Sequence, residues 1–253
     1  ACRTAVLLYH ALNYYNGRSR NHIAFFIMFL YCFSMKHHYR RYCIVLIIMF
    51  STVGMLFAHP HVLIDVRLLF EYDGAYCTGF WQEWTFDPIF SAELIEGWDK
   101  DRNRTFNKTE QQMLYNQAFI NLKNYGFYTL IRKGKHRITP SKVEQFSAWI
   151  EKNQVTYKFF VPLTTQEYSY DFNIAIFDTT YFCAIRYKEN FAEIIQKQEG
   201  MPIPQLSHAV NKNFPVYYNP QGSKQDMTTY SKPAPGLLTA YPEEIVVSAP
   251  KQE

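Results

Sequence analysis

Six side chains that carry oxygen atoms follow one another at fixed intervals in the segment 99–110. They are Asp99, Asp101, Asn103, Thr105, Asn107 and Glu110. Counted from Asp99, they occupy positions 1, 3, 5, 7, 9 and 12 of a loop, with the apolar Phe106 at position 8. This is the spacing of an EF-hand loop, which wraps one calcium ion in oxygen ligands and ends on a glutamate that supplies two of them. The segment therefore predicts a calcium site.

Two features of the loop argue against tight calcium binding. Arg104 stands at position 6, where glycine ordinarily makes the sharp turn. Four interleaved basic residues also dilute the negative charge of the loop. We expect any calcium affinity to fall in the weak extracellular range, with Kd of about 10⁻⁴ to 10⁻³ M. The alternative is a solvated loop in which Asn107 caps the next helix and Glu110 completes a capping box.

A second candidate site consists of His59 and His61, which directly follow Ala58. Ala58 ends a segment that looks like a signal peptide, and cleavage there would leave a free amine on His59. An amine combined with imidazoles suits nickel, cobalt, zinc or copper. Pro60 lacks the amide nitrogen that the amino-terminal copper and nickel motif uses, so we expect His59 and His61 themselves to chelate the metal. The alternative is two exposed histidines at a frayed terminus.

Two aspartates in acidic and aromatic segments could support such a transition-metal site. Asp87 ends the segment 83–87, and Asp178 lies in the similar segment 177–181. Each carboxylate could complete the site or orient its histidines. The alternative is that Asp87 caps a helix and Asp178 makes a turn. The sequence has no Gly-rich phosphate loop, nucleophile elbow or Cys-x-x-Cys motif, so we predict no catalytic residue and no enzyme activity.

Hydrophobic periodicity predicts the elements that position these residues. Alternating apolar residues predict a β-hairpin over 62–86 with its turn at Asp73-Gly74. Asp87-Pro88 opens a helix that ends at the acidic loop. A second helix runs from the loop to about Tyr125, with Gly126 as its C-cap. From residue 127 onward the apolar residues again recur at every second position. This pattern predicts antiparallel strands over 127–133, 142–151, 155–163, 168–177 and 181–187. The predicted fold class is α+β: an antiparallel β-sheet with an inserted helix–acidic loop–helix pair.

The composition divides the chain into four stretches. Residues 1–34 precede Met35 and are interpreted as upstream or over-extended sequence; residues 35–58 have the basic start and apolar run of a signal peptide. Residues 59–195 form the single α+β domain, and residues 196–253 an irregular Pro-rich tail with one short strand at 244–247. The apolar run is too short for a comfortable membrane span, and the alternatives are a retained anchor or a hairpin of two membrane segments.

Net charge and cysteine content indicate which binding partners and which disulfides are to be expected. Six of the 26 Lys and Arg residues and none of the 22 acidic residues lie in residues 1–58. The remainder therefore carries 20 basic and 22 acidic residues, a net charge near −2 that gives no reason to expect nucleic-acid binding. Cys77 and Cys183 are the cysteines of this remainder. They are candidates for one disulfide in an exported protein, and two buried free thiols are the alternative.

Five segments together resemble a known family. They are His59-Pro60-His61-Val62, the run 83–88, the acidic loop, Asn124-Tyr125-Gly126-Phe127 and the run 177–181. Over roughly residues 59–187 the chain resembles the domain of unknown function 1007 family, in which glycine stands where this chain has Arg104. The resemblance implies an exported bacterial protein, described as the periplasmic component of an uncharacterised ABC-type transport system and encoded near nickel and cobalt transporters.

These observations lead to three functional hypotheses. The first is a periplasmic accessory protein that passes nickel, cobalt or zinc to or from an inner-membrane transporter, with His59 and His61 as ligands. The second is a calcium-stabilised structural or interaction module, based on the acidic loop and an aromatic content of 18%. The third is a copper redox enzyme that uses the amino-terminal histidine.

Overall fold

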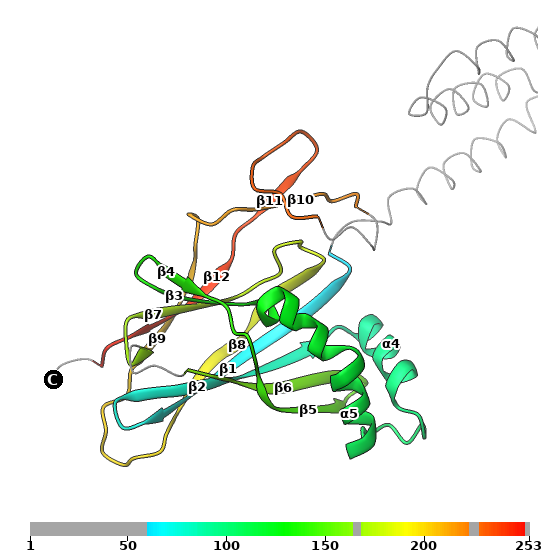
Figure 1. The fold of residues 1–253 in the computed structure, drawn as a ribbon, viewed down its shortest axis with the longest axis horizontal. Coiled ribbons are helices and arrows are strands. Elements are labelled where there is room, and N and C mark those ends of the chain that lie inside the picture. The colour runs from blue at the N-terminus through cyan, green and yellow to red at the C-terminus, as the bar shows by residue number, and fades with distance from the viewer. Residues whose placement is uncertain (1–59, 164–167, 223–227, 251–253) are drawn as a thin grey trace, which may run out of the picture. The chain divides into compact units, whose positions relative to one another are not determined.

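Two five-stranded β-sheets make up most of the structure, a computed structural model that describes residues 60–163, 168–222 and 228–250. In pairing order, the strands of the first sheet are β5 (Glu144–Glu151), β6 (Gln154–Pro162), β2 (Tyr76–Phe86), β1 (Val62–Asp73) and β8 (Cys183–Gln196). Those of the second are β4 (His136–Ile138), β3 (Thr129–Lys133), β7 (Phe172–Ile176), β12 (Glu243–Ser248) and β9 (Gln205–Val210). A separate pair joins β10 (Val216–Tyr218) to β11 (Leu238–Ala240), as Figure 1 shows. With the helices, these sheets confirm the predicted α+β class.

The described residues all belong to one of the two units into which the chain divides. That unit comprises residues 57–253, and the other comprises residues 1–56. The stretch 1–34, the predicted signal peptide 35–58 and His59 lie outside the described residues. In the described part, no helix combines the length and the apolar character that a membrane crossing requires.

The predicted hairpin of β1 and β2 forms the centre of the first sheet. Every second side chain of β1, from Val62 to Tyr72, faces the core and is at most 3% exposed, because successive residues of a strand point to opposite faces. Gly79 lets β2 pass close to β6: a Cβ there would lie 2.4 Å from the Val161 carbonyl oxygen and from the Phe160 ring. Any other residue at this position would push the two strands apart.

The strands are distributed over two sheets, whereas the sequence predicted one. The chain leaves the second sheet after β7 and enters the first as β8, which runs parallel to β1. The pairing of β8 with β1 shifts between Val66 and Leu68, whose partners are Tyr187 and Ala192, so residues 188–191 bulge out of the ladder. Alternation predicts which face of a strand is buried but not which strand lies beside it.

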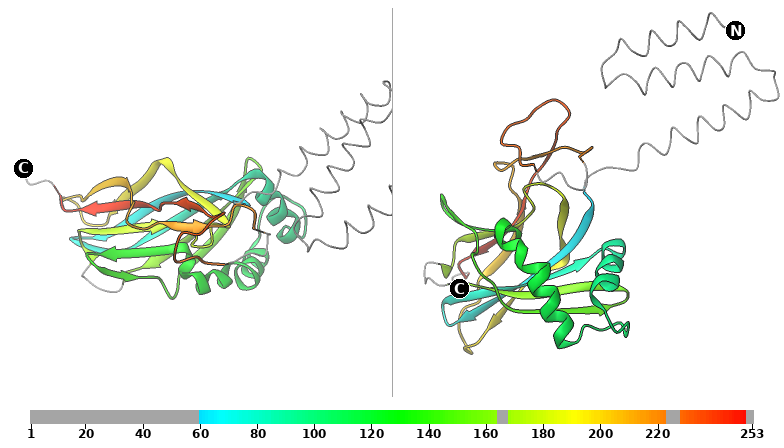
Figure 2. Two further views of the ribbon diagram at one scale, coloured as in Figure 1. Left: turned by 90° about the horizontal axis from the view of Figure 1, so that it is seen from above. Right: turned by 45° about the vertical axis from the view of Figure 1, so that its right-hand side comes forward.

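Helices cover the part of the first sheet where β1 begins (Figures 1 and 2). They are α4 (Pro88–Trp98), α5 (Lys108–Gln117) and η1 (Phe119–Tyr128). Helix α4 starts at the predicted Asp87-Pro88 cap. The single second helix predicted up to Tyr125 is instead two, because the chain breaks α-helical geometry at Ala118 and continues as a 3₁₀-helix. Gly126 has a left-handed φ of 58°, as expected of a helix-ending glycine.

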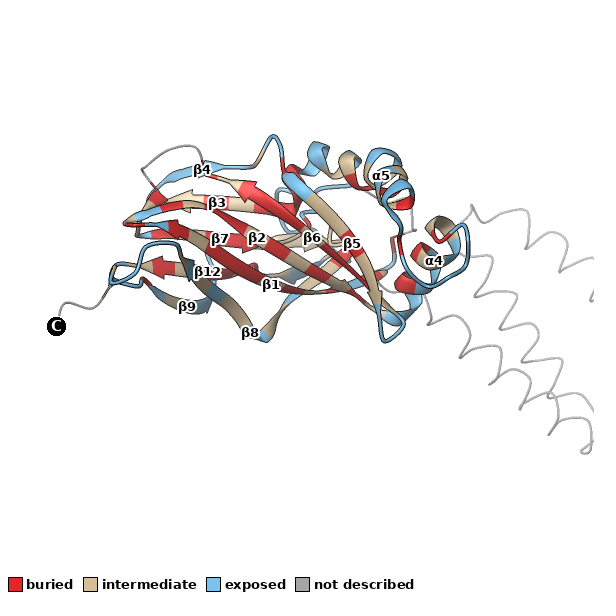
Figure 3. Ribbon diagram, turned by 90° about the horizontal axis from the view of Figure 1, so that it is seen from below, coloured by how far each residue is buried: buried red, intermediate tan, exposed pale blue. Residues whose placement is uncertain are grey.

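One hydrophobic core joins these layers. The ring of Phe119 on η1 lies 4.9 Å from that of Phe159 on β6, which anchors the helices to the first sheet. At the other end of β1, the ring of Phe70 lies 6.3 Å from that of Phe172 on β7, which anchors the second sheet. Figure 3 shows buried residues along the central strands of both sheets. The same face of the first sheet is therefore covered by helices at one end and by strands at the other.

The segment after residue 196 is part of this fold rather than an irregular tail. The predicted short strand at 244–247 is present as β12, and it lies between β7 and β9 in the second sheet. Ile245 and Val247 of β12 are completely buried. The eight prolines of this segment limit the length of its strands but do not prevent pairing, because β9 and β12 lie in short intervals between them.

Candidate metal centre

The acidic loop connects α4 to α5 and is fixed at both ends by helix caps. The backbone N–H of Asp99 ends α4 by donating to the Ile95 carbonyl at 3.0 Å. Asn107 and Glu110 form the predicted capping box at the start of α5, in which Glu110 Oε2 accepts from the Asn107 N–H at 3.0 Å. Phe106 is 6% exposed and attaches the middle of the loop to the core. The loop is therefore held by its own backbone and by one apolar anchor.

Three carboxylates converge in this loop. One oxygen from each of Asp99, Asp101 and Glu110 lies within 4.8 Å of the others. Asp99 and Glu110 are buried, at 5% and 3% exposure, while Asp101 is exposed. We call these three residues the acidic trio. They stand at positions 1, 3 and 12 of the loop, as the calcium spacing predicted.

The trio accepts hydrogen bonds from loop N–H groups. Asp99 accepts from the Asn103 N–H at 3.1 Å and from the Arg104 N–H at 2.9 Å. Glu110 Oε1 accepts from the Lys100 N–H at 2.7 Å. No Lys, Arg or His of the described chain forms an ion pair with any member of the trio. Three neighbouring carboxylates without a cation repel one another, and a bound divalent ion would remove that repulsion.

Arg104 takes the backbone conformation that position 6 of such a loop demands. Its φ is 64°, in the left-handed region that glycine adopts more easily. Its guanidinium is turned away from the trio and donates to Asn153 Oδ1 at 2.6 Å, in the turn between β5 and β6. The departure from glycine therefore costs backbone strain without placing the positive charge on the carboxylates.

The amide and hydroxyl side chains that were predicted as calcium ligands form hydrogen bonds within the loop and with the first turn of α5. Asn103 Oδ1 accepts from the Thr105 N–H at 2.8 Å and from the Thr105 hydroxyl at 2.5 Å. Asn107 Oδ1 accepts from the N–H groups of Thr109 and Glu110, as a helix cap does. The capping and calcium interpretations of the sequence are therefore compatible: the cap is formed, and the carboxylates still converge.

The transition-metal candidates do not form a comparable cluster. Asp87 accepts from the N–H groups of Ile89 and Leu63, both at 2.9 Å, and caps α4. Asp178 accepts from the N–H groups of Thr180 and Cys183 and shapes the turn before β8. In the described part of the chain, the acidic trio is the group of three potential ligands close enough to hold one ion.

His61 directly precedes β1, and its neighbour Phe182 directly precedes β8. Its backbone N–H donates to the Phe182 carbonyl at 2.9 Å, and its ring centroid lies 5.2 Å from that of Phe182. Its expected partner His59 lies outside the described residues. The chelate of His59 and His61 stays a prediction.

The two cysteines are free, so the disulfide candidate is not formed. Cys77 pairs with Tyr72 at the end of β1, whereas Cys183 pairs with Val62 at its start. Ten residues of extended strand separate these points, about 33 Å, far beyond the reach of a disulfide. Burial raises the pKa of the Cys77 thiol to about 12 and also raises that of Cys183. Both are therefore unreactive core thiols.

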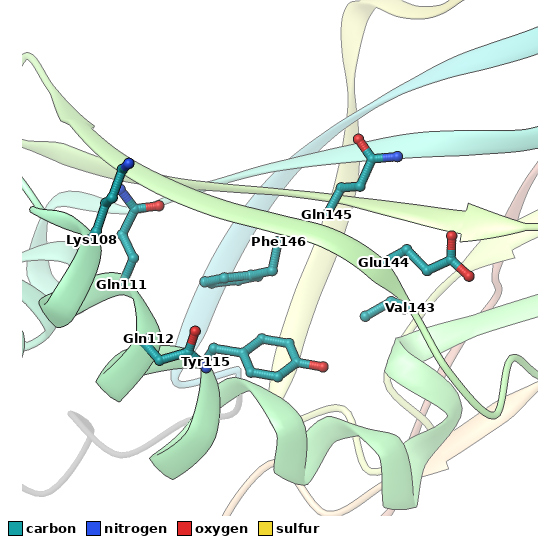
Figure 4. Close-up of a pocket in the computed structure, with 8 residues that line it drawn as sticks. All are labelled: Lys108, Gln111, Gln112, Tyr115, Val143, Glu144, Gln145 and Phe146. Atoms are coloured by element: carbon teal, nitrogen blue, oxygen red, sulfur yellow. The ribbon is translucent and has the colours of Figure 1, made fainter.

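An open hollow of about 400 Å³ lies beside the acidic loop, between α5 and β5. Figure 4 shows Tyr115 entering it from α5 and Phe146 from β5, and their ring centroids are 5.4 Å apart. Glutamine, lysine and glutamate side chains surround these rings. The hollow brings together no group of metal ligands among the described residues, so we do not include it in the site.

Two polar partners that matter here could not be identified from the sequence. Asn153 receives the Arg104 guanidinium from a turn 49 residues away. Glu244 lies buried on β12 and accepts from Arg132 Nη2 at 2.6 Å. Glu244 directly precedes the apolar residues 245–247 of the expected strand, but no residue near it in the sequence identifies Arg132 as its partner.

Comparisons with known proteins agree with the resemblance stated above. The profile of a family described as "Protein of unknown function (DUF1007)" matches residues 44–248. This match extends beyond the segments that carried the resemblance and includes β9 to β12. The chain is also 26% identical, over 132 residues, to an uncharacterized 15.5 kDa protein in the trpE 3′ region of Spirochaeta aurantia; the alignment covers 49% of this chain and 94% of that protein.

Proposed function

For this chain, which belongs to the DUF1007 family of proteins of unknown function, we propose that the acidic loop binds one calcium ion and that the ion stabilises the helical cover. The protein is then a calcium-stabilised structural or interaction module. The observation that carries the proposal is the convergence of Asp99, Asp101 and Glu110 within 4.8 Å without a cationic side chain.

The chemistry of the trio favours calcium over transition metals. Its donors are carboxylate oxygens, which suit hard cations, and no sulfur or imidazole donor belongs to the cluster. Further oxygen ligands can come from the exposed loop, because Asn103 and Thr105 lie at the surface. Calcium accepts six to eight oxygens in flexible geometry, so such a loop can adapt to it.

The location of the loop explains how an ion would stabilise the module. The loop is the covalent connection between α4 and α5, and both helices pack on the core of the first sheet. An ion held by Asp99 at the end of α4 and by Glu110 at the start of α5 would tie the two helix ends together. A weak site with Kd of about 10⁻⁴ to 10⁻³ M suits an extracellular calcium concentration, which agrees with the proposed export to the periplasm.

Isothermal titration calorimetry with calcium tests this proposal. We expect one site in the wild-type protein and none in Glu110→Gln, since glutamine keeps the capping box but loses the charge and the second carboxylate oxygen. Glu93→Gln removes an exposed charge from α4 and is the matched control, which should bind as the wild type does. An absence of calcium binding by the wild type would contradict the proposal, and equal binding by Glu110→Gln would remove the site from this loop.

The transition-metal role remains a separate prediction. Its ligands would be His59 and His61, its cargo nickel, cobalt or zinc, and its partner an inner-membrane transporter. Nickel and zinc titration of the wild type and of His59→Ala/His61→Ala measures it directly. Unchanged binding in the double variant would exclude these histidines as ligands.

A further inference from the structure

A second site lies between the first sheet and its helical cover, away from the acidic trio. Here the structure has a cavity of about 270 Å³ that is partly open to solvent. Its walls come from β1, β2, β6, α4, η1 and the first residues of β8. Phe86, Phe90 and Phe119 are among the aromatic residues that line it. Asn121 and Tyr125 of η1 are exposed and mark the side on which the cavity meets solvent.

The lining of this cavity is uncharged. It contains no Lys, Arg, His, Asp or Glu side chain. A charged molecule that entered would lose its hydration without gaining an ionic partner, which is strongly unfavourable. The cavity therefore selects for a neutral molecule with a large apolar surface.

Two buried tyrosines provide the polar contacts that such a molecule would need. Tyr157 on β6 is 4% exposed and lines the cavity, and its hydroxyl makes no hydrogen bond with any described residue. Tyr128 on η1 is 7% exposed and also lines the cavity. Its hydroxyl receives a long contact of 3.8 Å from the Cys183 thiol, and no described oxygen accepts its proton. Neither hydroxyl donates to an acceptor of the described chain, so both can donate to a ligand.

The size of the cavity limits the ligand further. A dry protein cavity of about 150 Å³ is known to hold one benzene ring. By this scale, about 270 Å³ accommodates roughly two fused rings with a small substituent. We propose that this cavity binds a neutral, mainly apolar molecule of that size carrying one hydrogen-bond acceptor, to which the hydroxyls of Tyr128 and Tyr157 donate. This inference does not depend on calcium binding by the acidic loop.

Three naphthalenes of similar shape test the proposal in calorimetric titrations of the full chain. The probe 2-acetylnaphthalene is neutral and has a carbonyl acceptor, 2-ethylnaphthalene lacks the acceptor, and 2-naphthoate carries a charge. We expect 2-acetylnaphthalene to bind about 10- to 100-fold more tightly than 2-ethylnaphthalene, the usual effect of two hydrogen bonds, and 2-naphthoate not to bind. Failure of both neutral probes to bind, or equal affinity for all three, would overturn the proposal.

Conservative variants assign the binding to this cavity. Tyr157→Phe and Tyr128→Phe should each weaken 2-acetylnaphthalene binding about 3- to 10-fold and leave 2-ethylnaphthalene unchanged. Tyr76→Phe removes a hydroxyl from an exposed tyrosine of β2 and should change neither affinity. Unchanged binding of 2-acetylnaphthalene by both cavity variants would refute the role of the hydroxyls.

A thermal melt and a filling variant separate binding from misfolding. Tyr157→Phe breaks no hydrogen bond between described residues, so its melting temperature should equal or exceed that of the wild type. Ala118→Leu adds side-chain volume at the cavity wall and should abolish binding of both neutral probes while the protein still melts cooperatively. Retention of wild-type affinity by a folded Ala118→Leu protein would place the binding elsewhere.

Discussion

Buried carboxylates occur in two parts of this molecule, Glu244 in the second sheet and Asp99 and Glu110 in the acidic trio, and their charges are balanced differently. In the second sheet, Glu244 is 5% exposed and accepts from Arg132 at 2.6 Å, from Asn211 at 2.7 Å and from Asn173 at 3.0 Å. In the acidic trio, two buried carboxylates accept from backbone N–H groups, and no cationic side chain of the described chain pairs with them. The negative charge of Glu244 is balanced by a side chain of the protein, whereas no positive charge balances the trio.

This difference separates a structural carboxylate from a candidate ligand. Burial alone does not make the distinction, because Glu244, Asp99 and Glu110 are buried to similar extents. The deciding feature is whether the protein supplies the counter-charge. Where it does, removing the partner should destabilise the fold; where it does not, neutralising the carboxylate should cost less stability and should abolish any gain from an added ion.

The largest effect is expected from Arg132→Ala. This change leaves Glu244 buried without its cation, and the loss of a charged hydrogen-bond partner from such a carboxylate typically costs about 1.5 to 3 kcal/mol of unfolding free energy. Arg137→Ala removes an arginine that stacks on Phe214 at 3.3 Å, outside this ion pair, and is the control. Urea denaturation measures the unfolding free energy of both variants. Equal losses in Arg132→Ala and Arg137→Ala would show that the ion pair with Glu244 stabilises the fold no more than the stacking on Phe214 does.

The next contrast compares loss of charge at the two sites without calcium. In chelator, Glu110→Gln should lower the unfolding free energy by less than Glu244→Gln does, because relief of repulsion within the trio partly offsets the loss of an oxygen that accepts from the backbone N–H of Lys100 or Asn107. Glu244→Gln should lower it, because the Arg132 side chain then lacks its anion. With calcium at 10 to 100 times Kd, the wild type should gain about 1.4 to 2.7 kcal/mol and Glu110→Gln nothing. A calcium-dependent gain in Glu110→Gln would contradict this distinction.

A smaller effect is expected from acid. Burial by itself raises the pKa of Glu244, but hydrogen bonds from Arg132 and Asn211 outweigh it and hold the pKa below its ordinary value. The stabilisation is therefore complete above the unfolded-state pKa of about 4.3 and is lost as the pH falls through the lower folded-state value. Urea denaturation across this range should show a steeper loss for the wild type than for Glu244→Gln. If the unfolding free energies of the two proteins fell in parallel with pH, the protonation of Glu244 would not be coupled to unfolding.

The smallest effect is expected from Arg104→Gly. Glycine relieves the left-handed strain at φ 64° but also gives up the hydrogen bond to Asn153, so the net gain in stability should be at most about 1 kcal/mol. Calcium affinity should rise, since a positive charge leaves the loop. Asn153→Gly, also at a left-handed φ of 64°, removes the same hydrogen bond without changing the loop and should leave the affinity unchanged. Weaker binding by Arg104→Gly would contradict the interpretation.

Features that depend on neighbouring residues were predictable from the sequence. The β1–β2 hairpin, the Asp87-Pro88 start of α4 and the Asn107/Glu110 capping box each follow from residues within a few positions of one another. The acidic trio also lies within one loop, so its spacing predicted its convergence.

Features that depend on distant partners were not predictable. The parallel pairing of β8 with β1 and the central place of β12 in the second sheet join segments separated by long stretches of chain. The cavity and its tyrosines arise only when η1, β2 and β6 meet. No local pattern in one sequence specifies such encounters, because many pairings satisfy the same alternation.

The order of the strands also has a kinetic consequence. The edge strand of the first sheet, β8, ends at residue 196, and the strand that joins β7 to β9, β12, begins at residue 243. Neither sheet can be completed until distant segments meet, and folding slows as contacts become less local. The hairpin can form early, but the two sheets are complete only when segments from nearly the full length of the described residues have paired. Folding should therefore be slow, and a chain that ends before β12 would leave β7 and β9 without the strand that joins them.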